Sequence, residues 1–249
     1  MNNPVTSPVT TPAQTSAQPE NGKLLRVAIN IGNSLLAHAG EPGTDPTGIS
    51  VDIARRLASE LQCPLALLIY ASAGAVFAAK DDDKWDVAFL AIDPERAKHL
   101  SFSQPYVQIE GTYLVPINAP HTRCLQLDEP GHRIATERNA AYDLHLSRSL
   151  LHAQTDKAEP PQTAFELFEA KGLDAAAGIR QELEAIAAGC VGFRVLEDCY
   201  MTIWQAVVTQ PQGWVNSVAV NTLVAQLKTD GWLTQTLAKH GLPQALAAH

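Results

Sequence analysis

The segment WDVAFLAIDPERAKHLSFSQPY, residues 85–106, decides the fold that this sequence predicts. Its first part, WDVAFLAI (85–92), is an apolar run between charged residues, which is typical of a buried strand. Asp93 and Pro94 then predict a helix start, because aspartate accepts hydrogen bonds from free helix N–H groups and proline suits the first helical position. The chain therefore passes directly from a buried strand into a helix.

We expect this helix to end at Ser-Gln-Pro (103–105), and a long extended run to follow over 106–116, interrupted by Gly111. Apolar runs alternate with amphipathic stretches on both sides of this segment. The alternation predicts an α/β fold with mostly parallel sheets covered by helices. The other expected elements are strands at 24–31, 64–70, 132–136 and 173–179, extended segments at 193–198 and 200–208, and helices at 49–61, 73–84, 138–152, 164–172, 181–189, 220–231 and 232–241.

The composition excludes several classes of protein. The 249 residues include 18 Lys and Arg against 26 Asp and Glu, a net charge of −8, so the chain has no general electrostatic footprint for nucleic acid or an anionic membrane. Apolar residues make up 46% of the chain, enough for a substantial core. No apolar run reaches the ~18 residues that a transmembrane helix needs.

Residues 1–22 are rich in Pro, Ser, Thr and Gln and nearly lack large apolar side chains. Such a segment cannot repay the entropy of ordering, so we expect a disordered tail over 1–22. The same residues lack the basic and apolar pattern of a secretory signal. This pattern predicts a cytoplasmic protein if the N-terminus is native; otherwise an export signal is missing from the sequence.

The four cysteines do not form a metal-binding pattern. None lies in a CxxC motif, and no paired histidines lie nearby, so we predict no metal site and no cofactor. We expect buried free thiols, with a disulfide between Cys190 and Cys199 as the alternative in an exported protein.

The order of these segments resembles the extracellular solute-binding proteins of family 3, the polar-amino-acid receptors of ABC transporters. The resemblance covers roughly residues 23–245. Four stretches carry it: LRVAINI with GISVDIARRLASEL, WDVAFLAIDPERAKHLSFSQPY, GTYLVP, and LVAQLKTDGWLTQTLAKHG.

The resemblance implies a two-lobed, periplasmic-binding-protein-like (type II) fold, each lobe a mostly parallel sheet flanked by helices. Lobe 1 would comprise 23–112 and 206–249, and lobe 2 would comprise 113–205, including two extended crossover strands. The ligand would lie between lobes that close like a hinge. The resemblance further implies a monomeric periplasmic protein that captures an amino acid or organic acid through its carboxylate, with the permease of an ABC transporter as its partner.

Arg96 is the first candidate for ligand binding. In the family the arginine of this motif makes a forked contact with the ligand carboxylate, which suits the two parallel donors of a guanidinium group. The alternative is a surface arginine paired with Glu95 or Asp93. Asp93 would either accept the ligand ammonium or only cap its helix. Leu90 and Ala91 stand where the family has hydroxyl-bearing residues.

A second set of contacts is implied at a helix start in lobe 2, where the family usually has Gly-Thr or Gly-Ser. Asn139 and Ala141 stand there, and free N–H groups at a helix start bind an anion even without hydroxyls. Tyr142 would supply a phenol or an aromatic wall, or else belong to the core.

The family often has an acidic residue after the last strand of lobe 2, which grips the ligand ammonium. This chain has Gly178 there, followed by Arg180 and Gln181. The missing carboxylate and the added cation favour a ligand with several carboxylates or without an amine.

Other candidates lie in loops and crossovers. Asn30 and Asn33 follow the first strand, in a loop that faces the cleft in the family, although either could simply form a turn. Glu110 and Gln205 lie on or beside the crossovers. Trp204 is expected to pack at the hinge.

Two alternative functions remain open from the sequence. The first is an enzyme of the same fold, such as a prephenate or cyclohexadienyl dehydratase, which would need a general acid or base in the cleft. No GxSxG, HExxH, GxxxxGK[ST] or GxGxxG motif supports an enzyme, and we expect none. The second is a freestanding ligand sensor.

Overall fold

The computed structural model describes residues 9–10 and 22–248. The tail expected over 1–22 therefore lies almost wholly outside the described residues. Within it, β1 (Val9–Thr10) pairs antiparallel with β3 (Leu65–Tyr70) at the edge of the sheet. None of the described helices is long and apolar enough to cross a membrane.

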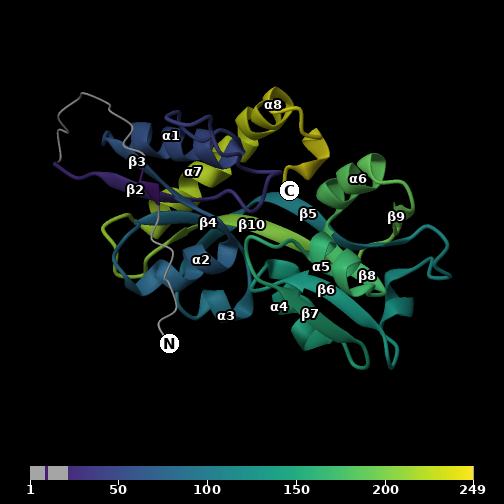
Figure 1. Ribbon diagram of the computed structural model, residues 1–249. Coiled ribbons are helices and arrows are strands. Elements are labelled where there is room, and N and C mark those ends of the chain that lie inside the picture. The colour runs from purple at the N-terminus through teal and green to yellow at the C-terminus, as the bar shows by residue number, and fades with distance from the viewer. Residues whose placement is uncertain (1–8, 11–21, 249) are drawn as a thin grey trace.

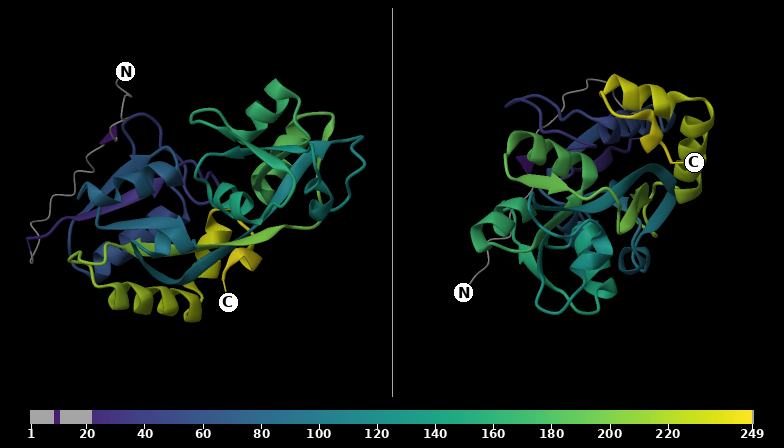
Figure 2. Two further views of the ribbon diagram at one scale, coloured as in Figure 1. Left: turned by 90° about the horizontal axis from the view of Figure 1, so that it is seen from below. Right: turned by 90° about the vertical axis from the view of Figure 1, so that its right-hand side faces the viewer.

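Two lobes lie on either side of a pair of long connecting strands (Figure 1; Figure 2, left). In each lobe three neighbouring strands run parallel, which confirms the predicted two-lobed α/β fold. Their order is β3-β2-β4 in lobe 1 and β8-β6-β7 in lobe 2. These strands are β2 (Leu25–Asn30), β3 and β4 (Val87–Ala91), then β6 (Arg133–Glu137), β7 (Gln154–Ala158) and β8 (Ala175–Ile179).

The two connecting strands are β5 (Ser101–Pro116) and β10 (Met201–Thr209). They pair antiparallel with each other; β10 also pairs with β4, while the far end of β5 pairs with β8 and the short β9 (Phe193–Val195). Gly111 lies where β5 passes from β10 to β8. A Cβ atom there would lie only 2.8 Å from Met201 Cγ and 3.2 Å from the Tyr200 ring, so a larger residue would force these side chains to shift.

Helices pack on both faces of the lobe 1 strands. Val27 and Ile29 of β2 belong to one buried cluster, whereas Ala28 between them belongs to another. A strand buried on both faces must be apolar throughout, which explains the unbroken apolar runs in the sequence.

The helices are α1 (Ile49–Glu60), α2 (Ala73–Ala78), α3 (Pro94–Ala97), α7 (Ser217–Thr229) and α8 (Trp232–Lys239) in lobe 1, and α4 (Ala141–Ser149), α5 (Ala164–Lys171) and α6 (Arg180–Gly189) in lobe 2. Short 3-10 turns occur at η1 (Ala79–Asp81), η2 (Cys124–Leu127) and η3 (Gln244–Leu246).

The prediction that Ser-Gln-Pro (103–105) ends a helix is wrong. Helix α3 ends at Ala97, and this tripeptide lies inside β5. Pro105 is tolerated because the β5–β10 register shifts on both sides of its partner Ala206, at an irregularity where proline costs no regular ladder bond. The Ser103 hydroxyl accepts a hydrogen bond from Val207 N (3.1 Å) at the same place.

Two elements of lobe 2 also differ from the prediction. Helix α4 begins at Ala141 rather than 138, because Asn139 adopts a left-handed backbone with φ 61° that a helix cannot contain. Strand β7 was not predicted, since its sequence QTDKA is polar and the strand lies at the edge of the sheet.

All four cysteines (Cys63, Cys124, Cys190 and Cys199) are free thiols. The alternative of a disulfide between Cys190 and Cys199 is not formed. Cys199 is exposed and Cys190 partly so, whereas Cys124 is buried and burial raises the pKa of its thiol to about 12.

The start of β4 is tied to β2 by Asp86, which is 5% exposed. Its carboxylate accepts hydrogen bonds from the backbone N of Arg26 (2.8 Å) and from the guanidinium atoms Nε (3.1 Å) and Nη2 (2.7 Å). Asp83 binds the same guanidinium, but its side chain is 92% exposed. The two aspartates therefore form a matched pair, one buried and one exposed.

We expect Asp86→Asn to lower the free energy of unfolding by about 2 kcal/mol, since hydrogen bonds to a charged group are lost in a buried place. Asp83→Asn is the control and should cost well under about 1 kcal/mol, because solvent screens an exposed pair. Urea denaturation of both variants measures the difference. Equal costs would show that burial of Asp86 contributes nothing.

Candidate functional site

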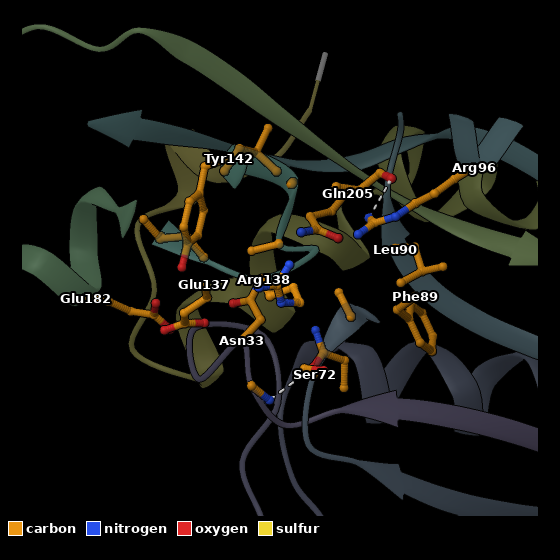
Figure 3. Close-up of a pocket in the computed structure, with 18 of the residues that line it drawn as sticks. Asn33, Ser72, Phe89, Leu90, Arg96, Glu137, Arg138, Tyr142, Glu182 and Gln205 are labelled. Carbon is orange, nitrogen blue, oxygen red and sulfur yellow. Dashed lines mark hydrogen bonds between the residues drawn. The ribbon is translucent and has the colours of Figure 1, made fainter. Parts of the chain in front are cut away.

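A cavity lies between the two lobes, at the carboxyl ends of their parallel strands (Figure 3). The empty space between its walls is about 620 Å³, and part of that space is open solvent. Open α/β sheets bind ligands at this edge because the loops that follow parallel strands meet there.

Lobe 1 contributes residues that follow β2, β3 and β4. Asn30 ends β2, and its Oδ1 accepts a hydrogen bond from Gly32 N at 3.0 Å, so this side chain shapes the turn as well as lining the cavity. Asn33 is 8% exposed, and its Oδ1 has no hydrogen-bond partner among the described residues. A buried unpartnered acceptor is costly, so Asn33 is suited to a donor from outside the chain. Ser72, Ala73, Phe89, Leu90 and Ala91 complete this side.

Arg96 lies at one end of the cavity (Figure 3). It is 1% exposed, and it donates to two backbone carbonyls, from Nη1 to Ala91 O (3.2 Å) and from Nη2 to Asn139 O (2.9 Å). Burial lowers its pKa to about 10, so it stays charged at neutral pH. Within residues 22–248 it forms no ion pair. The nearby Asp93 carboxylate raises the pKa of Arg96 and Arg148 lowers it, but the hydrogen-bond acceptors of the Arg96 guanidinium in the described chain are carbonyls, so the site is chemically suited to an anion.

Lobe 2 contributes two carboxylates that were not predicted from the sequence. Glu137 is the last residue of β6, and Glu182 lies in the first turn of α6, directly after β8. Because β6 and β8 are parallel neighbours, their carboxyl ends meet, and the two carboxylates lie side by side (Figure 3). The hydroxyl end of Tyr142 points toward Glu137.

Burial raises the pKa of both carboxyl groups. The charge of Glu182 raises the pKa of Glu137 further, while hydrogen bonds from Ala164 N and the Tyr142 hydroxyl oppose the shift. Glu182 Oε1 accepts from Ser34 N (3.0 Å) and from Ser34 Oγ (2.6 Å). Two partly desolvated carboxylates so close together favour either a shared proton or a cation beside them.

Most of the predicted ligand-binding residues line this cavity, but some do not. Those that line it are Arg96, Asn30, Asn33, Leu90, Ala91, Ala141 and Tyr142, together with Gln205. Those that do not are Asp93, Asn139, Glu110, Arg180 and Gln181.

Asp93 has other partners for both of its oxygen atoms. Oδ1 caps α3 by accepting from Glu95 N (2.9 Å), and Oδ2 pairs with Arg148 Nη2 (2.7 Å). The capping alternative is thus realised, and each oxygen of Asp93 already accepts a hydrogen bond from the protein. Asn139 contributes its backbone carbonyl to Arg96, while its N–H donates to Asp143 Oδ2 (2.9 Å).

Arg180 points away from the cavity. Its Nε pairs with Glu110, and its Nη atoms donate to the carbonyls of Leu196 (3.0 Å) and Glu197 (2.8 Å). Gln181 buries its Oε1 without a partner among the described residues, also away from the cavity. The position of Arg180 therefore gives no support to the prediction of a ligand rich in carboxylates, which stays a prediction. Trp204 is 39% exposed and does not line the cavity. Its neighbours on β10, Ile203 and Gln205, do line it, so Trp204 lies on the opposite face of the strand.

The sequence profile of the bacterial extracellular solute-binding proteins, family 3, matches residues 25–243. This chain belongs to that family. No curated protein matches the sequence at a significant level.

Solved structures of solute-binding proteins share the fold. A protein from Wolinella succinogenes, complexed with lysine, has a TM-score of 0.73 at 19% identity over 87% of this chain and 94% of its own. An amino acid ABC transporter substrate-binding protein from Streptococcus pneumoniae, bound to L-arginine, has 0.73 at 21% identity over 88% and 94%. A solute receptor for L-cysteine of Neisseria gonorrhoeae has 0.72 at 21% identity over 87% and 89%. An ancestral amino acid-binding protein that is a precursor of cyclohexadienyl dehydratase has 0.72 at 22% identity over 87% and 94%, so binding proteins and the precursor of an enzyme share this fold.

Direct contacts join the two lobes of this family 3 protein around the cavity. Arg148 on α4 reaches across to Asp93, and Ser34, after β2, donates to Glu182 on α6. Gly74 on α2 allows a third close approach, since a Cβ atom there would lie 2.9 Å from Asn139 Cβ. The structure is therefore the closed arrangement of the lobes.

Gly74→Ala should hold the lobes apart without weakening the fold, because alanine favours a helix by up to about 1 kcal/mol over glycine. We expect a larger radius of gyration by small-angle X-ray scattering and an unchanged or higher melting temperature. Gly189→Ala at the end of α6 is the control, since nothing lies within 4 Å of its Cβ position. An unchanged radius in Gly74→Ala would mean that this contact does not govern closure.

The raised pKa of Glu137 predicts a pH dependence of stability. The folded state holds this proton to higher pH than the unfolded state, so the stability that it contributes is present below the ordinary pKa of 4.5 and is lost as the pH rises through the raised value. Glu137→Gln mimics the protonated group. The melting temperature of this variant minus that of the wild type should therefore increase as the pH rises from about 4 to 8.

Glu169→Gln, at an exposed site on α5, is the control for replacing a glutamate by glutamine. Differential scanning calorimetry in a pH series measures both variants. A difference for Glu137→Gln that is flat or shrinks with pH would contradict the raised pKa.

Proposed function

We propose that this protein is the solute receptor of an ABC transporter, and that it captures an amino acid between its lobes on the outer side of the cytoplasmic membrane. The observation that best supports this is the buried Arg96 guanidinium, which lines the cavity and has no ion-pair partner within the described chain. An amino acid carboxylate would supply the missing counter-charge through a forked contact.

The position of the start of α4 also supports placing the ligand carboxylate at the Arg96 end of the cavity. Ala140 and Ala141 line the cavity, and Asn139 just before them bonds to Arg96. The N–H groups and the dipole at a helix start favour negative charge, so the carboxylate would bridge Arg96 of lobe 1 and α4 of lobe 2. A ligand that contacts both lobes stabilises the closed arrangement over an open one.

The family and the similar structures support the remaining parts of this proposal. Family 3 proteins are extracellular; two of the similar structures hold lysine or arginine, and a third is a receptor for L-cysteine. We place lobe 1 at 23–112 with 206–249 and lobe 2 at 113–205, with the hinge where β5 and β10 pass between them. The protein would act as a monomer that delivers its ligand to a permease.

Binding of amino acids should raise the melting temperature, because a ligand of the folded state stabilises it by mass action. Arg96→Lys keeps a positive charge but loses the planar fork, so we expect affinity to fall by about 2 kcal/mol, or ~30-fold, in isothermal titration calorimetry. Arg123→Lys is the control, since Arg123 is 74% exposed and does not line the cavity.

Circular dichroism would show that Arg96→Lys is folded. Wild-type affinity in this variant would remove Arg96 from the binding site. If no amino acid shifts the melting temperature of the wild type, the proposed function is wrong.

A further inference from the structure

We infer that the ligand carries a second positively charged group, which binds at the Glu137–Glu182 end of the cavity, so that the ligand is a cationic amino acid. The inference rests on the proposed function, because it assumes that a carboxylate binds at Arg96. It assigns recognition of the side-chain amino or guanidino group to residues of this chain that were not singled out from the sequence.

Four side chains form an acceptor surface at this end. The carboxylates of Glu137 and Glu182 lie side by side, the Tyr142 hydroxyl points toward them, and Asn33 lies just across from lobe 1 (Figure 3). Asn33 is the independent observation, because its buried Oδ1 is an acceptor without a partner in the described chain. Acceptors from both lobes thus converge on one place, as an ammonium or guanidinium group requires.

The negative charge at this end is not balanced by the protein. Glu182 is bound by uncharged donors of Ser34, and Glu137 receives a long contact of 3.5 Å from Ala164 N. Arg138 lines the cavity, but its guanidinium already pairs with Glu159. Among the described residues neither carboxylate has an ion-pair partner, so a cation of the ligand would meet two carboxylates.

The position of this surface distinguishes a side-chain cation from the α-ammonium. Figure 3 shows Arg96 on one side of the cavity and the Glu137–Glu182 pair on the other, with Gln205 between them. The α-ammonium is attached to the same carbon as the carboxylate, so it stays near Arg96. We therefore assign the two carboxylates to a charge at the far end of a side chain; a second carboxylate there would be repelled.

The test uses pairs of ligands that differ in one charge: norleucine is lysine without its terminal amino group, and citrulline is an uncharged isostere of arginine. Isothermal titration calorimetry of the wild type should show lysine at least about 30-fold tighter than norleucine, and arginine at least about 30-fold tighter than citrulline. Glutamate should bind more weakly than either cation. These comparisons need no variant and therefore do not depend on whether a substitution folds.

Glu137→Gln with Glu182→Gln should reduce both preferences to less than about threefold. Each preference is a ratio of two affinities measured on the same variant, so a general effect of the substitutions on lobe closure cancels. Glu169→Gln is the matched control and should retain the wild-type preferences. A double variant that keeps the full preference for lysine and arginine would overturn the inference.

The outcomes separate the inference from the proposed function. If norleucine or glutamate binds as tightly as lysine, and Arg96→Lys weakens it, the proposed function stands and the inference fails. If cadaverine binds as tightly as lysine, the cation site stands but the role of Arg96 fails. If no amino acid binds, both fail.

Discussion

A buried guanidinium group without a counter-ion is the constraint on which the site depends. Arg96 is 1% exposed and is held by the carbonyls of Ala91 and Asn139, one from each lobe. Burial of an unpaired charge is expensive, and proteins tolerate it where the charge has a function. The local sequence brings this about: Asp93 caps a helix of one turn directly after β4, and that turn directs Arg96 back toward the end of its own strand. The nearby carboxylate of Asp93 is itself bound by Arg148, which leaves Arg96 available to a ligand.

The two-lobed topology gives the cavity its polarity. Each lobe presents the carboxyl ends of parallel strands, and the connecting strands β5 and β10 hold those edges opposite each other. Lobe 1 supplies the cation, Arg96, and lobe 2 supplies the carboxylate pair, Glu137 and Glu182. If both charges lay on neighbouring loops of one sheet, the arginine and the carboxylates would pair with each other. Charges placed on different lobes and at opposite ends remain apart, and a ligand with matching ends can bridge them (Figure 3).

The sequence predicted what depends on local pattern and missed what depends on neighbours distant in the chain. Continuous apolar runs located the buried strands, and Asp-Pro located the start of α3, so Arg96 and its surroundings could be predicted. Glu137 could not, because its role depends on β6 and β8 being neighbours, and an acidic residue after a strand is common. Arg180 was misassigned because its partner Glu110 is 70 positions away. Glu182, two residues after Arg180, lies in the first turn of α6. The direction of that helix depends on how it packs in the fold, so the sequence alone did not place Glu182 in the cavity.

Closure of the lobes has different energetics with and without a ligand. Closure itself forms the Asp93–Arg148 pair and the bonds between Ser34 and Glu182, and these favour the closed arrangement whatever lies in the cavity. Closure also buries Arg96 and the two carboxylates between the lobes; burial lowers the pKa of Arg96 and raises the pKa of Glu137 and Glu182, so it disfavours their charged forms and opposes closure. A ligand with opposite charges at its two ends would pair with Arg96 and with the carboxylates, which removes the cost of burying them. The contacts between the lobes that favour closure remain. The coupling of binding to closure therefore comes from charges that the protein keeps unpaired, since only a group that binds the two arrangements differently can shift their equilibrium.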